Sequence, residues 1–143
     1  DFEVIQGKQS IQQYEMGYVT HADESEEEYI IGGAAEDFRT VMDDVFEDYL
    51  SLKEEKGIVV KYIGGSSEKT EYLKHFGVHS NQESRFLEKL PEGTASMVIR
   101  NDSVSFFSYP VPPLVYVVKS PTVAAHYKKF FEMLWEMSDT PNT

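Results

Sequence analysis

The sequence predicts an α/β protein with one mixed sheet of about six to seven strands flanked by helices, in the order β-α-β-α-β-α-β-β-β-β-α. In the first half of the chain, short apolar runs alternate with segments of helical periodicity, which is typical of right-handed βαβ units. In the second half, short strand-like runs are separated by turn residues. The chain then carries an amphipathic segment that begins at Ser120 and Pro121.

The length and composition predict a single domain over residues 1–143. The chain has 143 residues, and its 41% hydrophobic and 13% aromatic residues are sufficient for one core. It has no cysteine, which excludes disulfides, thiolate nucleophiles and thiolate zinc sites and favours a cytoplasmic location. No apolar run approaches the roughly 18 residues that span a bilayer, so we expect no membrane contact. Because residue 1 is Asp1 and not methionine, we expect either an excised piece or a processed product of a longer protein.

The chain is strongly acidic. It carries 13 Lys and Arg residues against 25 Asp and Glu residues, which gives a formal net charge of -12. This charge repels phosphate backbones and anionic membrane surfaces. We therefore expect that this domain does not bind DNA directly. We interpret the acidic run at residues 23–28 as a solvated loop.

Three strand-then-helix units are predicted in the first half, with strands at residues 2–6, 28–31 and 58–63. The helix after the second strand is predicted to be long, because its apolar positions repeat at helical spacing from Phe38 to Leu50. Gly57 is its expected C-terminal stop.

Four further strands and a last helix are predicted in the second half. We expect residues 84–87, 95–100 and 103–107 to form short antiparallel strands, the last two joined by a tight turn. An extended proline-rich crossing then leads to a buried strand at residues 114–118. Ser120 is expected to cap the final helix, with Pro121 in its first turn.

The candidate ligand site is a set of glycine-rich loops that follow the first three strands. Ligands of α/β sheets bind outside the carboxyl ends of the strands, where helix N-termini present free N–H groups and suit an anion. These loops are therefore expected to share one sheet edge and to contact a small ligand. The alternative is that the glycines only satisfy turn geometry. The candidate residues are Gly7, Lys8, Ser10, Gly32, Gly33, Gly64, Gly65, Ser66 and Ser67.

No catalytic motif is complete in this chain. His126 and Lys128 form a His-x-Lys pair, but they are expected on different sides of a helix, and Met133 stands where phospholipase D chemistry has Asp. His75 and His79 are four residues apart with a glycine between them, so no metal site is predicted. No nucleotide loop of the GxGxxG or Walker type is present, and we predict no cofactor and no enzymatic activity.

The last helix carries an apolar stripe that includes Phe131 and Trp135. Such a stripe is more often core than partner surface. Because these residues lie near the end of the chain, they are also candidates for an interface with a second subunit.

The sequence resembles the phospholipase D-like domain that follows the winged helix in TrmB-type transcriptional regulators. The likeness is carried by Val-Ile-Gln-Gly at residues 4–7, by Glu-Asp-Phe at residues 36–38, and by Arg-Phe-Leu-Glu-Lys-Leu-Pro at residues 85–91. The most specific part is Tyr-Val-Val-Lys-Ser-Pro-Thr-Val-Ala at residues 116–124, which continues to Phe-Phe-Glu-Met-Leu-Trp at residues 130–135. The resemblance implies a phospholipase D-like half-domain.

The resemblance also implies a function. It implies an effector-sensing and homodimerisation domain that contacts DNA only through a separate winged-helix domain preceding residue 1. Family members that sense sugars use a further C-terminal domain, so no sugar-binding residue carries over. Two alternatives remain open at the level of sequence: a phosphodiesterase-type enzyme assembled across a dimer, and a purely structural dimerisation module.

Overall fold

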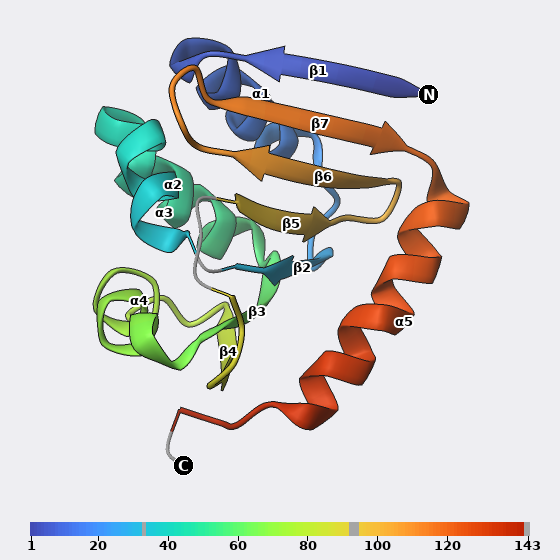
Figure 1. The fold of residues 1–143 in the computed structure, drawn as a ribbon. Coiled ribbons are helices and arrows are strands. Elements are labelled where there is room, and N and C mark those ends of the chain that lie inside the picture. Colours follow the sequence, from blue (N-terminus) through green and yellow to red (C-terminus); the bar gives the residue numbers. More distant parts are fainter. Residues whose placement is uncertain (33, 92–94, 142–143) are drawn as a thin grey trace.

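The computed structural model describes residues 1–32, 34–91 and 95–141. Within these ranges the chain forms one seven-stranded sheet with the strand order β1-β7-β6-β5-β2-β3-β4 (Figure 1). The strands are β1 (Phe2–Gln6), β2 (Glu27–Ile31), β3 (Val59–Gly65), β4 (Gln82–Leu87), β5 (Ala95–Ile99), β6 (Ser103–Ser108) and β7 (Leu114–Lys119). The element order and the mixed sheet confirm the predicted fold class.

Helices cover both faces of the sheet. In Figure 1, α1 to α4 lie on one face and α5 lies on the other. The helices are α1 (Lys8–His21), α2 (Ala35–Met42), α3 (Phe46–Lys56), α4 (Lys69–His75) and α5 (Pro121–Met137), with 3₁₀ turns η1 (Asp43–Val45) and η2 (Ser66–Glu68). Across the described ranges, no helix is both long and apolar enough to cross a membrane.

Strand directions place the carboxyl ends of β1, β2 and β3 at the same sheet edge. The strands β2, β3 and β4 pair in parallel, whereas β5, β6, β7 and β1 are joined by antiparallel pairings. The antiparallel prediction is therefore correct for β5 and β6 and wrong for β4. The reason is that α4 crosses between β3 and β4, which makes this segment a third βα unit rather than part of the meander.

The predicted long helix is two helices. The backbone of Asp43 has a φ of +46°, which an α-helix does not accommodate, so α2 ends there and α3 starts at Phe46 after one 3₁₀ turn. Apolar spacing did not reveal the break, because Met42 and Phe46 are both buried in the same cluster on either side of it. The end of α3 is as predicted, with Gly57 left-handed at a φ of +77°.

Successive side chains of a strand point to opposite faces of the sheet. In β2, Tyr29 packs toward α5, and its neighbour Ile30 packs toward the other helices. The central strands are therefore buried on both faces. The core on the α1 to α4 face is rich in rings, and it is on this face that the cavities described below lie.

The last helix is capped as predicted, since the Ser120 hydroxyl accepts a hydrogen bond of 3.2 Å from the backbone N–H of Val123. Its Phe131 is 1% exposed and meets the Tyr29 ring edge to face at 5.1 Å. Phe131 therefore belongs to the core of this chain and offers no surface to a partner. Trp135 is half-buried, stacked on Phe131 and covered by the guanidinium of Arg85 at 4.6 Å.

Candidate functional site

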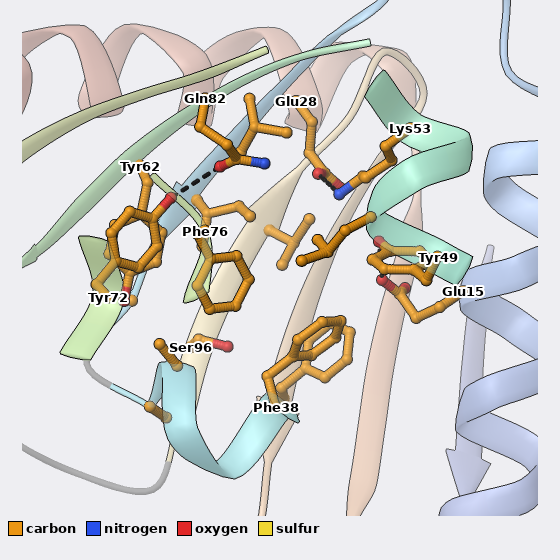
Figure 2. Close-up of a pocket in the computed structure, with 18 of the residues that line it drawn as sticks. Glu15, Glu28, Phe38, Tyr49, Lys53, Tyr62, Tyr72, Phe76, Gln82 and Ser96 are labelled. Atoms are coloured by element: carbon orange, nitrogen blue, oxygen red, sulfur yellow. Dashed lines mark hydrogen bonds and ion pairs between the residues drawn. The ribbon is translucent and has the colours of Figure 1, made fainter. Parts of the chain in front are cut away.

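An inner cavity of about 50 Å³ lies between the sheet and the helices α2, α3 and α4. Figure 2 shows the rings of Tyr62, Tyr72 and Phe76 on one side of it and Tyr49 with Glu15 on the opposite side. Most of its lining is aliphatic or aromatic, with a few polar groups between. A largely apolar cavity with a small number of converging polar groups is the usual form of a small-molecule site.

An outer cleft of about 540 Å³ adjoins this cavity. Ala34, Ala35, Tyr72 and Phe76 line both spaces, so the cleft and the cavity share a wall at the start of α2 and along α4. The rest of the cleft is formed by the segments after β2, β3 and β4, at the carboxyl edge of the parallel strands. This is the edge at which ligands of α/β sheets bind.

Two of the predicted glycines are explained by the packing of Tyr62. A Cβ at Gly32 would lie 2.1 Å from the Tyr62 hydroxyl oxygen, and one at Gly64 would lie 2.3 Å from Glu68 Oε1 and 2.6 Å from the Tyr62 ring. A side chain at either position would therefore displace Tyr62 or Glu68. These glycines leave room for the tyrosine, whose hydroxyl donates to Glu68 at 2.5 Å.

The inner cavity is closed on one side by a buried network of charges. Arg100, directly after β5, donates from Nε to Glu28 at 2.8 Å and from Nη2 to both oxygens of Glu15 at 2.9 and 3.0 Å. Lys53 of α3 forms a second ion pair with Glu28. The Tyr49 hydroxyl donates to Glu15 at 2.7 Å. Two carboxylates and two cations thus balance their charges inside the protein.

Burial and neighbouring charge act in opposite directions on these groups. Burial disfavours the ionised form of Glu28, but the charges and hydrogen bonds of Lys53 and Arg100 outweigh it, so the pKa of Glu28 is lowered. For Arg100, burial is outweighed by Glu15 and Glu28, and its pKa is raised. Burial, followed by the charge of Glu15, raises the pKa of Tyr49. Glu28 and Arg100 are therefore charged at neutral pH, while Tyr49 keeps its proton.

The structure brings together only part of the predicted ligand site. Gly32 lines the inner cavity, and Gly65 and Ser67 line the outer cleft. Gly64 and Ser66 adjoin these residues without being part of either lining. Gly33 lies outside the described residues.

The first predicted loop lies elsewhere. Because β7, β6 and β5 separate β1 from β2, the loop after β1 is four strand spacings away, roughly 19 Å. Gly7 has a φ of +93°, so it serves a turn, and Lys8 forms an ion pair with Asp43 at 2.5 Å. Ser10 is an exposed residue of the first turn of α1. The sequence correctly placed the loop after β1 at the same sheet edge as the other two loops. It did not reveal how far apart the loops lie along that edge.

Acidic side chains dominate the outer cleft, and sequence reasoning did not assign them to a site. Glu36, Asp37, Glu68 and Glu71 line it together with His75. In the sequence these acidic residues follow directly after the predicted glycine loops. Their position next to the loops could have indicated that they belong to the same site. Glu36, Glu71 and His75 can each offer one metal-ligand atom, and these atoms lie within 4.8 Å of one another.

His126 and Lys128 have different surroundings in the structure and do not converge on one site. On α5, Lys128 lies 5.2 Å from the centroid of the Tyr29 ring, whereas His126 is exposed beside Tyr127. His21 contacts the carbonyl of Gly17 at the end of α1. Of the four histidines in the sequence, only His126 has a lysine two residues after it.

No protein-family model matches the sequence, and no curated protein matches it. Among solved structures, the chain is similar to TrmBL2, an archaeal chromatin protein with a novel mode of DNA binding, at 15% identity and a TM-score of 0.65. The match covers 97% of this chain and 53% of that chain, so this chain spans about half the length of TrmBL2.

Two further solved structures are similar over their whole length. One is Nuc from Salmonella typhimurium, a phospholipase D family member, at 13% identity and a TM-score of 0.67, covering 98% of both chains. The other is NucT from Helicobacter pylori, at 11% identity and a TM-score of 0.63, also covering 98% of both chains. The chain therefore has a phospholipase D-like fold, as the resemblance in sequence implied, and at these identities the likeness is one of fold alone.

The charge network predicts that Arg100 is far more important to stability than an exposed arginine. Arg100→Met leaves two buried carboxylates against one lysine, and it should lower the free energy of unfolding by about 3 to 5 kcal/mol. Urea unfolding measures this loss. Arg39→Met is the matched control, because it removes only the exposed pair with Glu36 and should shift the midpoint little. Equal losses in both variants would contradict the assigned role of the network.

The lowered pKa of Glu28 predicts a loss of stability in acid. The pKa is lower in the folded chain than its ordinary value of 4.5, so this group stabilises the fold above pH 4.5 and ceases to do so as the pH falls through the folded value. A carbon-13 NMR titration should show the Glu28 carboxylate still ionised at pH 4.5 in the native protein but half-protonated there in urea. Titration above 4.5 in the native protein would mean that burial dominates and would reverse the predicted pH dependence.

Proposed function

We propose that this chain is the effector-binding and dimerisation domain of a TrmB-type transcriptional regulator, and that it catalyses no reaction. The observation that carries the proposal is the pair of adjoining cavities at the carboxyl edge of β2, β3 and β4, which together form a cleft with an apolar interior. A small effector that binds there contacts both the sheet and the helices α2 and α4. Binding then changes how this domain positions the rest of the regulator.

DNA binding is assigned in this proposal to a winged-helix domain that precedes residue 1 in the full-length protein. The net charge of -12 argues against a phosphate-binding surface on this domain. TrmBL2, which is a DNA-binding protein, is about twice as long as this chain and shares its fold over 53% of its length. The length difference leaves room for a separate DNA-binding part.

A phosphodiester-hydrolysing enzyme is the second candidate, and one observation favours it. Such an enzyme requires a histidine that faces a cleft, and His75 lines the outer cleft beside Glu71 at 3.6 Å. Against it stand the four carboxylates of the same cleft, which repel an anionic phosphodiester. The incomplete His126-x-Lys128 pair on α5 adds no catalytic group to this cleft.

The effector role predicts a ligand whose binding depends on Ala35. A thermal-shift screen with amino acids, amines, sugars and nucleotides should find a compound that raises the melting temperature, since a ligand at 100 times its Kd adds about 2.7 kcal/mol of stability. Ala35→Phe should abolish this shift, because the larger side chain fills the wall between the two cavities. Ala125→Phe, on the exposed side of α5, is the control.

A screen in which no compound shifts the melting temperature would refute the effector role. Hydrolysis of bis(p-nitrophenyl) phosphate that disappears in His75→Ala would establish the enzyme in its place. Replacement of His21, His79 and His126 in the same assay separates a cleft-based activity from any other.

Dimerisation is the second part of the proposal, and its supporting feature is the outer side of α5. Phe130, Met133 and Met137 are 42%, 52% and 67% exposed, and their spacing places them along one side of the helix. Sedimentation velocity should show a dimer that Met133→Lys weakens and that the neighbouring Glu132→Lys leaves intact. A wild-type chain that stays monomeric at about 100 μM, roughly a hundredfold above a micromolar Kd, would remove dimerisation from the proposal.

A further inference from the structure

The outer cleft has a one-sided charge. Four carboxylates line it, and among the described residues no lysine or arginine does. Two of them, Glu36 and Asp37, lie in the first turn of α2 and already occupy the positive end of that helix. The other two, Glu68 and Glu71, come from η2 and α4. An anion, which free helix N-termini would favour, is therefore repelled from this edge.

Internal partners neutralise only a part of this negative charge. Glu36 pairs with Arg39 at 2.5 Å, and Glu71 lies 3.6 Å from His75, which is cationic only when protonated. Glu68 accepts a hydrogen bond from the hydroxyl of Tyr62. Asp37 forms no ion pair with another described residue. A recessed surface with excess charge of one sign concentrates counter-ions.

The wall between the cleft and the inner cavity is apolar and held in place. The ring of Tyr72 stacks between Tyr62 at 4.0 Å and Phe76 at 4.8 Å, with interplanar angles of 13° and 7°. Tyr72 also donates from its hydroxyl to Gln82 at 2.8 Å, as the dashed line in Figure 2 shows. A ligand in the cleft thus meets carboxylates on one side and carbon surface on the other.

We propose that the effector is a small primary amine. Its ammonium group binds the carboxylates of the outer cleft, and its short apolar tail lies against Tyr72 and Phe76 toward the inner cavity. An ammonium group suits this cleft because it is compact and offers three hydrogen-bond donors. A tail that reaches past this wall enters an inner cavity of about 50 Å³, which has room for only about three to five water-sized groups, so we expect a tail of a few carbons. This inference rests on the effector role proposed above.

The test compares three probes that each have four carbons but differ in charge: butylamine, 1-butanol and butyrate. NMR titration of the nitrogen-15-labelled chain at pH 7.4 should show butylamine shifting the amide signals of α2 and α4 with a Kd at least about tenfold below that of the other two, a ratio that corresponds to 1.4 kcal/mol. The Glu71→Gln variant should bind butylamine severalfold more weakly, and its binding should depend less on salt concentration. Glu71 is exposed, so this variant should fold, and Glu132→Gln on α5 is the matched control.

Binding of butyrate or 1-butanol as tight as that of butylamine would overturn the proposal, as would an unchanged Kd in Glu71→Gln. Zinc chloride that alone shifts the signals of Glu71 and His75, with no response to butylamine, would make the cleft a metal site instead. A sugar or carboxylate that binds in an Ala35-dependent manner would overturn the amine and leave the effector role standing. If no compound binds, both the amine proposal and the effector role are overturned.

Discussion

The buried ion network around Arg100 governs how the sheet and the helices meet at the inner cavity. It joins β5, β2, α1 and α3 through Arg100, Glu28, Glu15 and Lys53, all of which are less than 5% exposed. Each charge would be costly to bury alone, and the set is tolerated because its two carboxylates and two cations balance. The network therefore requires these four elements to meet in one arrangement. That arrangement fixes one side of the inner cavity.

The opposite side of the cavity depends on aromatic packing rather than on charge. Tyr62 lies across Gly32 and Gly64, where no side chain larger than hydrogen fits, and it carries the stack of Tyr72 and Phe76. The glycines thus contribute to the site indirectly, since they create the space in which its wall is built. The inner cavity thus lies between an ionic side and an aromatic side, and residues at the start of α2 and along α4 line both it and the outer cleft.

The fold alone does not choose between a regulator and an enzyme. The same phospholipase D-like architecture is found in a chromatin protein and in a phospholipase D family member, so function has to be argued from side chains. Four of the side chains that line the cleft in this chain are carboxylates, which suit a cation and repel a phosphodiester. The effector role that we propose therefore rests on the electrostatics of the cleft more than on topology.

Local periodicity, turn residues and strand direction were enough to predict the fold class, most strand positions, the Ser120 cap and the sheet edge that the candidate loops share. Long-range packing and strand order determine which residues meet at that edge. The break at Asp43, the parallel pairing of β4 and the separation of Lys8 from Gly65 depend on strand order and backbone strain, which have no local signature. Likewise, Arg100 and Glu15 are 85 residues apart, and no periodicity pairs them.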